Sequence, residues 1–312
     1  MAKIATREAY GKALAELGKV NDKIVVLDAD LSKSTKTADF GKEFPDRFIN
    51  MGIAEANMMG VAAGLSTCGK IPFVSSFAMF AAGRAFEQIR NSICYPRLNV
   101  KICATHAGLT VGEDGASHQA IEDLAIMRAI PNMTVISPAD AVETEAAIKA
   151  IAEYEGPCYV RLGRAAVNVI NDPATYKFEI GKGVELREGN DVTIVATGIM
   201  VDEALVAQEA LKNEGISARV INIHTLKPLD VNLLVKAAKE TKAIVTVEEH
   251  NIIGGLGSAV SEALSEECPV PLVKVGVRDT FGESGKPNEL LKAYGLTAEN
   301  IVEAVKKAIS LK

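Results

Sequence analysis

Short apolar runs alternate with segments of helical spacing along most of the chain, and this alternation limits the possible folds more than any other feature. Helical spacing occurs at Arg7–Leu17 and Ala139–Ile151, among other segments. The apolar runs of strand length in the first half are Lys23–Leu27, Ile71–Ser75, Asn99–Ala104, Asn132–Ile136 and Cys158–Arg161. Strands that alternate with helices at this spacing form parallel sheets with helices on both faces. The sequence therefore predicts an α/β fold.

The alternation is interrupted once, which predicts two domains. Between about residues 163 and 190, Gly, Pro, Asn and Asp residues mark turns instead of a periodic pattern. A second series of strands and helices begins at Asp191 with the run VTIVATG. A chain of 312 residues, 48% of them hydrophobic, can bury two cores. We expect a first domain at residues 1–170, a linker at 171–190 and a second domain at 191–312.

The composition argues against several classes of partner. A net charge of −6 and a pI near 5.5 give no sign of binding to nucleic acid or to an anionic membrane. No apolar run is long enough to span a bilayer, and the first residues have no signal-peptide core. The five cysteines are scattered and form no C-x-x-C pair, which predicts buried free thiols in a reducing compartment. We therefore expect a cytoplasmic protein.

Glu55 is the only charged residue between Arg47 and Lys70, and it lies near the start of a predicted helix rich in small residues. The helix macrodipole favours a carboxylate in the first turn, so one interpretation is a solvent-exposed charge. The other interpretation is a buried carboxylate in a pocket of small residues, where it could share a proton with a ring nitrogen. Glu55 taken alone leaves both interpretations open.

The richest polar stretch, Thr105–Glu122, directly follows a predicted strand. It contains His106, Asp114 and His118 together with three glycines. A histidine alone is usually a surface or core residue, but three titratable groups in one loop at a strand end indicate a functional site. Their spacing matches no helical zinc pattern, and no cysteine is placed to help. We predict no metal site here.

The sequence GGLG at 254–257 raises the alternative of a dinucleotide-binding loop. Val260 stands where that fingerprint would have its third glycine. The stretch also follows the charged residues 248–250 rather than the end of a strand, which we predict at Ala243–Val247. We therefore interpret GGLG as the start of a helix that packs closely at a domain or subunit contact.

The motifs of the chain resemble those of the transketolase family of thiamine diphosphate enzymes. The resemblance covers nearly the whole chain and corresponds to the C-terminal subunit of a split transketolase: a pyrimidine-binding domain followed by the family's C-terminal domain. The matching motifs are ATRE (5–8), DADLSKS (28–34), GIAE (52–55), SFAMFAAGRAFEQIR (76–90), THAGLTVGEDGASHQ (105–119), RLGR (161–164), LKPLD (226–230) and EEHNIIGGLGS (248–258). Deoxyxylulose-phosphate synthases share GIAE but usually have an arginine at the position of His106, so this residue favours transketolase.

The resemblance implies a role for each cofactor-binding residue. Glu55 would bond the aminopyrimidine ring of thiamine diphosphate and promote the tautomer that activates the cofactor. Phe77 and Phe80 would form an aromatic wall against the pyrimidine, although both could also be ordinary helix core in the predicted helix Phe77–Ile93. Leu31 and Ile53 would give apolar support.

The resemblance also implies how a sugar phosphate would bind. His106, Asp114 and His118 would contact the sugar hydroxyls, and the two histidines would move protons with Glu55 as catalytic groups. The residues that would bind the substrate phosphate are Arg7, Ser34 and Arg164. Without the resemblance, Arg7 would be interpreted as a solvated helix charge.

Two departures from the family pattern bear on these roles. Gly83 occupies a position where many transketolases have a third aromatic residue, so the wall is more open or is completed by Phe86. The family's diphosphate and metal motif, Gly-Asp-Gly followed by Asn-Asn, is absent from the sequence. We therefore expect an N-terminal transketolase subunit as partner, holding magnesium or calcium in a two-plus-two heterotetramer. The helix Ala54–Gly64 is a candidate for the buried centre of that interface.

The implied activity is transfer of a two-carbon ketol unit from a ketose phosphate to an aldose phosphate, as in the pentose phosphate pathway. Two related activities remain alternatives: a deoxyxylulose-phosphate synthase fragment, and the beta subunit of an oxoacid dehydrogenase. A further alternative, from a different class, is a non-catalytic assembly subunit.

Overall fold

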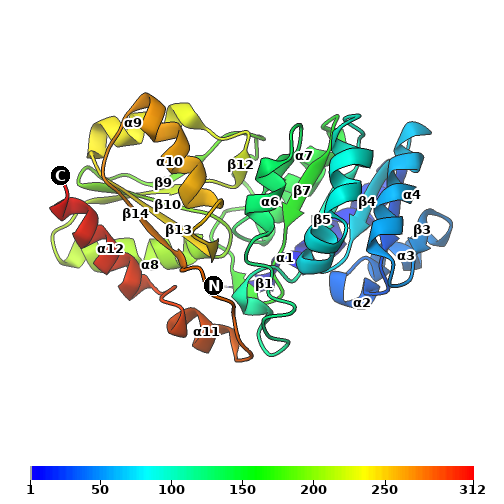
Figure 1. Cartoon of the computed structure of the whole chain (residues 1–312), viewed down its shortest axis with the longest axis horizontal. Helices are drawn as coiled ribbons and strands as arrows, with labels where there is room; N and C mark the ends of the chain where they lie inside the picture. Colours follow the sequence, from blue (N-terminus) through cyan, green and yellow to red (C-terminus); the bar gives the residue numbers. More distant parts are fainter. Residues whose placement is uncertain (1) are drawn as a thin grey trace.

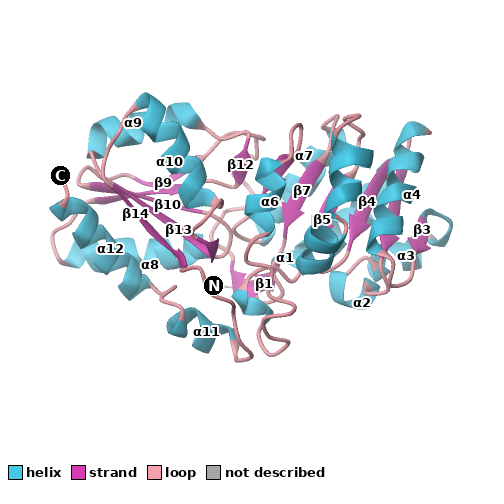
Figure 2. Cartoon of the chain, in the orientation of Figure 1, coloured by secondary structure: helices cyan, strands magenta, loops and turns pink. Residues whose placement is uncertain are grey.

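The computed structural model describes residues 2–312 and shows two α/β domains side by side (Figure 1). Each domain has one sheet of mainly parallel strands, with helices on both faces of the sheet (Figure 2). The predicted fold class is confirmed.

The first sheet has seven strands, all parallel except the edge strand β12. In spatial order they are β12 (Thr225–Lys227), β6 (Thr134–Ile136), β7 (Cys158–Arg161), β5 (Lys101–Ala104), β4 (Ile71–Ser75), β2 (Ile24–Asp28) and β3 (Phe48–Asn50). The helices of this domain are α1 (Thr6–Val20), α2 (Ser32–Thr35), α3 (Ala38–Glu43), α4 (Glu55–Thr67), α5 (Phe86–Gln88), α6 (Asp123–Ala129) and α7 (Ala141–Glu153).

Strand β2 shows why the central strands are apolar throughout. Ile24 and Val26 pack with residues of α1 and α7 on one face of the sheet. Val25 and Leu27 pack with α4 on the other face. Because successive side chains of a strand point to opposite faces, a strand covered on both sides needs a continuous apolar run.

The second sheet has five strands, and only β9 is antiparallel. In spatial order they are β14 (Leu272–Val277), β13 (Ile244–Asn251), β10 (Val192–Ala196), β11 (Ala218–Asn222) and β9 (Val184–Arg187). The helices are α8 (Met200–Asn213), α9 (Val231–Thr241), α10 (Leu256–Glu267), α11 (Pro287–Ala293) and α12 (Ala298–Ser310). Strand β9 lies inside the segment that the sequence predicted as a linker.

The two domains share packing and strand pairing. Apolar residues of α9 and α10 are continuous with the core around α4 in the first domain. Strand β12 comes after β11 in the chain but pairs with β6 of the first sheet. Near the domain boundary, β1 (Lys3–Ala5) pairs antiparallel with β8 (Ala166–Asn168). The domains are therefore built as one unit.

Two predicted elements differ in the structure. The segment after Phe77 is helical but is not one regular α-helix, because π-helical turns at Met79–Arg84 and Ile89–Cys94 flank α5. In a stretch rich in Ala and Gly, apolar spacing does not distinguish these wider turns from an α-helix, and π-helical turns are frequent at functional sites. Strand β13 continues beyond the predicted end at Val247 to Asn251, so Glu248, Glu249 and His250 are strand residues.

The five cysteines are free, and three of them are buried as expected. The expectation is wrong for Cys68, which is exposed at the end of α4, and Cys268 is partly exposed. Within residues 2–312, no helix is both long enough and apolar enough to cross a membrane.

Candidate active site

The predicted site residues of the first domain lie just beyond the carboxyl ends of neighbouring parallel strands. Leu31 and Ser34 follow β2, and Phe77 follows β4. His106 follows β5, and Glu55 begins α4, the helix after β3. The carboxyl edge of an open parallel sheet is the usual position of a ligand site. The sheet order therefore gathers side chains from four separate segments.

His106 is buried, with only 3% of its surface exposed. Its ring stacks on the ring of Phe77, with 3.8 Å between centroids. Nε2 lies 3.4 Å from Nη1 of Arg7, and Nδ1 lies 2.9 Å from the hydroxyl of Thr105. Because arginine only donates hydrogen bonds, this geometry makes Nε2 the acceptor and leaves the ring proton on Nδ1.

The surroundings keep the His106 ring uncharged. Burial, followed by the positive charges of Arg7 and Arg164, lowers the pKa of His106 to about 3. A neutral imidazole can donate or accept a hydrogen bond at physiological pH without carrying charge. His106 is therefore suited to orienting a hydroxyl group.

Phe80 and His118 extend the aromatic surface that begins at Phe77. The ring centroids of Phe77 and Phe80 are 6.0 Å apart in a stacked arrangement. The ring of His118 meets Phe80 edge-on, with 5.2 Å between centroids. Such pairs contribute on the order of 1 kcal/mol beyond the burial of their surface. Phe77 and Phe80 thus contact the histidines of the site, and they can also belong to the helix core.

Glu55 is 2% exposed, so the interpretation of a solvent-exposed charge is wrong. Arg84 Nη1 donates to both carboxylate oxygens at 2.9 Å, and the guanidinium also lies over the ring of Phe80 at 4.6 Å from the centroid. The sequence interpretation missed Arg84. The sequence feature that could have identified it is an arginine four residues after Phe80, in a segment of small residues.

The two arginines predicted to bind phosphate lie on opposite sides of His106 in the chain. Arg7 Nη1 donates to the backbone carbonyl of Ser34 at 2.8 Å. Arg164 donates to the carbonyl of Val111 and forms an ion pair with Glu113 at 3.0 Å. Burial lowers the pKa of Arg7, although an arginine stays charged at neutral pH. Both guanidinium groups are only partly exposed.

Asp28, which belongs to the motif DADLSKS but received no role of its own from the sequence, fixes the loop that carries Leu31 and Ser34. Its buried carboxylate accepts hydrogen bonds from the backbone N–H of Leu31 at 2.6 Å and from the hydroxyls of Thr35 and Thr37 at 2.6 and 2.8 Å. A buried carboxylate is retained where several donors satisfy it. The signal was an aspartate at the carboxyl end of an apolar strand.

Two predicted residues lie apart from this buried group. Ile53 is 78% exposed, and Asp114 is also exposed, on the loop after Gly112. Neither is part of the contacts around His106 within this chain.

The residues present fit one end of thiamine diphosphate. Each oxygen of Glu55 has lone pairs beyond those used by Arg84, so the carboxyl group can share a proton with a ring nitrogen: it accepts a hydrogen bond when the nitrogen carries the proton and donates one when the carboxyl group carries it. Phe80 is partly exposed and stacks beside the buried Phe77, so the two rings can form one side of an aromatic pocket for a pyrimidine. Within residues 2–312, no group of three or more His, Cys, Asp or Glu side chains is arranged to hold a metal ion.

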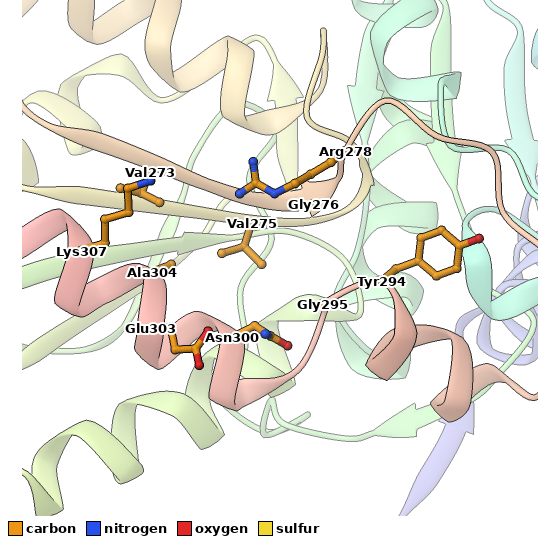
Figure 3. Close-up of a pocket in the computed structure, with 10 residues that line it drawn as sticks. All are labelled: Val273, Val275, Gly276, Arg278, Tyr294, Gly295, Asn300, Glu303, Ala304 and Lys307. Atoms are coloured by element: carbon orange, nitrogen blue, oxygen red, sulfur yellow. The ribbon is translucent and has the colours of Figure 1, made fainter.

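A separate hollow of about 290 Å³ lies in the second domain between β14 and α12 (Figure 3). Val273 and Val275 form its floor, and Asn300, Glu303 and Lys307 line it from α12. None of the predicted site residues lines this hollow. We assign the candidate site to the sheet edge of the first domain, where the titratable and aromatic side chains described above lie.

Comparison with known families covers both domains. Residues 2–169 match the family model described as "Transketolase, pyrimidine binding domain". Residues 181–301 match the model described as "Transketolase, C-terminal domain".

Individual relatives agree with these matches. The chain is 57% identical over 303 residues to the "Putative transketolase C-terminal section" of Methanocaldococcus jannaschii, covering 96% of this chain and 94% of the relative. It is 48% identical over 299 residues to the "6-deoxy-6-sulfo-D-fructose transketolase subunit SqwH" of Clostridium sp. strain MSTE9, and that match covers 96% of this chain and 92% of the relative. The mouse transketolase is 44% identical, and there the match covers 99% of this chain but only 49% of the relative.

A solved structure described as "Split gene transketolase, inactive beta4 tetramer" superposes with a TM-score of 0.93 at 66% sequence identity. The match covers 99% of this chain and 99% of that one. With both domains, their order and the whole length accounted for, the chain belongs to the transketolase family as a subunit built of that family's pyrimidine-binding and C-terminal domains.

Proposed function

We propose that the chain is the C-terminal subunit of a two-chain transketolase that transfers a two-carbon ketol unit from a ketose phosphate to an aldose phosphate. The observation that carries this proposal is the contact of Phe77 and Phe80 with His106 and His118 beside the buried carboxylate of Glu55. A cofactor-binding surface and groups for sugar hydroxyls thereby share one sheet edge.

In this proposal the cofactor supplies the nucleophilic carbon that breaks and forms carbon–carbon bonds, and the chain supplies binding, orientation and proton transfer. Glu55 would share a proton with a ring nitrogen of the pyrimidine, and Phe77 and Phe80 would contact its face. His106 and His118 would orient hydroxyls and move protons at the reacting oxygens.

Anion recognition would come from Arg7 and Arg164, whose guanidinium groups can bind two oxygens of a phosphate at once. A sulfonate presents a similar set of oxygens, and the Clostridium relative is named for a 6-sulfo sugar. A sulfonated ketose is therefore a second candidate donor. An assay that compares a ketose phosphate with pyruvate as the donor, with an aldose phosphate as acceptor, separates these activities from those of a deoxyxylulose-phosphate synthase or an oxoacid dehydrogenase.

The proposed partner is a chain that carries the diphosphate and metal site, which the sequence motifs lack. Three observations support it: the match to about half the length of the mouse enzyme, the naming of relatives as sections or subunits, and the description of the solved tetramer of a similar chain as inactive. The exposed face of α4 suits a contact surface, because nothing lies within 4 Å of a Cβ atom added at Gly60 or Gly64. Two copies of each chain would give two equivalent sites.

Replacing Glu55 with Gln tests the cofactor assignment. We expect the turnover of the two-chain complex to fall by roughly 10²- to 10⁴-fold, because a carboxamide cannot exchange a proton with the ring. The measurement is steady-state ketol transfer, with the circular dichroism spectrum as a check of folding. Glu87→Gln, an exposed carboxylate on α5, is the control. Retention of near wild-type turnover by Glu55→Gln would contradict the assignment.

The His106 ring should stay neutral between pH 5 and 8, since its pKa lies at about 3. In ¹⁵N-histidine-labelled chain, its ring resonances should keep the pattern of the Nδ1–H tautomer across that range. Arg7→Ala should raise the pKa of His106 while leaving it below the ordinary value, because burial is the larger cause. A titration of the His106 resonances with a midpoint near pH 6.5 would show that the ring is solvated.

Arg164→Ala should raise the KM for phosphorylated donors about ten-fold to a thousand-fold, as expected for loss of a charged contact. The KM for hydroxypyruvate, which has no phosphate, should change little. Arg187→Ala, an exposed arginine on β9, serves as the control. Equal losses on both donor types would mean that Arg164 supports the loop or the cofactor instead, and a 6-sulfonated ketose assayed in parallel compares the two anions.

The purified chain should show no ketol transfer with thiamine diphosphate, magnesium and sugar phosphates until the partner chain is added. Gly60→Arg should leave the isolated chain folded, because the space around Gly60 is open, but should prevent recovery of activity and formation of the mixed complex. Light scattering reports the complex, and Glu209→Arg on α8 is the control. Robust activity of the single chain would refute the proposed division between subunits.

A further inference from the structure

The loop that carries His106 and His118, here called the site loop (residues 105–119), has an unusual backbone. His106 has a φ of 57°, in the left-handed region that costs a residue with a side chain about 1–2 kcal/mol. Gly108 and Gly112 have φ values of 82° and 87°. Conformations of this kind persist only where the surrounding structure fixes them. The contacts that fix the site loop therefore bear on the position of His106.

One of these contacts comes from the second domain. The side chain of Glu249 on β13 is 3% exposed, and its Oε1 accepts a hydrogen bond from the backbone N–H of Thr110 at 2.6 Å. Strand β13 runs toward the first domain in Figure 1. A Cβ atom at Gly108 would lie 2.3–2.5 Å from the carboxyl group of Glu249. The carboxyl group thus touches the turn on both sides of Leu109.

The backbone of Glu249 is fixed as well. Arg161, at the end of β7, donates from Nη2 to the carbonyl of Glu249 at 2.9 Å and to the carbonyl of Ala120 at 3.1 Å. Arg161 is itself paired with Asp123 at 3.0 Å. Gly108 N–H also donates to the carbonyl of Ala120 at 2.8 Å. One buried guanidinium therefore connects the strand of Glu249 with the residue just after the site loop.

Keeping Glu249 in this position has a cost. Burial raises its pKa to about 7, although the nearby charge of Arg161 and the bond from Thr110 act in the opposite direction. An apolar side chain would pack between the domains without that penalty. The carboxyl group is of use where the buried backbone donor of a turn must be held.

We propose that Glu249 is a positioning residue that acts from the second domain, fixing the turn at Gly108–Thr110 and through it the place of His106 in the site. The kinetic consequence rests on the proposed ketol transfer, whereas the structural consequence does not. In this arrangement, the second domain of the subunit serves as the support for the substrate-binding loop.

Glu248 provides a matched control within the same strand. It is fully buried, and burial raises its pKa to about 7, as for Glu249. Its oxygens accept hydrogen bonds from the backbone N–H groups of Leu256 and Gly257 at 2.7 and 2.8 Å. Those donors belong to α10, in the same domain. Glu248 and Glu249 therefore differ mainly in one respect: only Glu249 accepts a hydrogen bond from the site loop.

The experiment compares Glu249→Ala, Glu249→Gln and Glu248→Ala by amide hydrogen exchange and, in the two-chain complex, by kinetics. Both alanine variants should lower the melting temperature by a few degrees, because each leaves buried N–H groups without an acceptor. Only Glu249→Ala should speed exchange in residues 105–119. In the complex it should lower kcat/KM for the ketose phosphate by about ten-fold to a hundred-fold, as expected for a misplaced binding group.

Glu249→Gln should restore slow exchange and activity, because its carboxamide oxygen can still accept the hydrogen bond from Thr110. If Glu249→Ala does not fold, Glu249→Asp, which shortens the side chain by one CH₂ group, takes its place with the same expected direction. Equal effects of the Glu248 and Glu249 variants on site-loop exchange and on kcat/KM would overturn the proposal, as would unchanged exchange in Glu249→Ala. Absence of ketol transfer in the wild-type complex would refute the proposed function alone, since the exchange comparison still decides the role of Glu249.

Discussion

The buried ion pair of Arg161 and Asp123 lies at the junction of the two domains and positions a guanidinium that bonds to both. Both side chains are almost fully buried, and Tyr159 donates its hydroxyl to Asp123 at 2.7 Å. Two charges taken out of water are stabilising only when their geometry is good and their remaining donors are satisfied. Here the spare donor, Nη2, bonds carbonyls of both domains. The pair therefore fixes the sheet edge of the first domain against the strand that carries Glu249.

Most of the fold could be predicted from the sequence because it follows from local apolar spacing. The run IVVLD of β2 and the helical spacing of α7 are such cases. Elements that depend on distant partners could not be predicted. Strand β12 is three residues long and is defined by its pairing with β6, and β9 is defined by its pairing with β11. The charged end of β13 was missed for the same reason, since those side chains are buried by groups far away in the sequence.

The residues of the candidate site likewise fall into two groups: those that a local motif marks and those that only contacts distant in the sequence reveal. Motifs identified Glu55, Phe77 and His106, which the fold brings to one sheet edge, although their roles remain predictions. Arg84 and Glu249 were not identified, because their partners lie 29 and 139 residues away and no local pattern marks such a bond. A sequence motif shows which chemistry is present, whereas the supporting ion pairs are visible only in three dimensions.

One side of the candidate site is buried and supported within this chain, whereas the other side is exposed. This arrangement suits a site that another chain completes. On the inner side, His106 is buried and its loop is supported by the second domain. On the outer side, Ile53 is 78% exposed, although it lies two residues before the buried Glu55. A partner that docks on the outer side would cover apolar surface that is already presented. Because the inner side is formed in advance, association would not have to order it, and less of the binding free energy would be lost to conformational entropy.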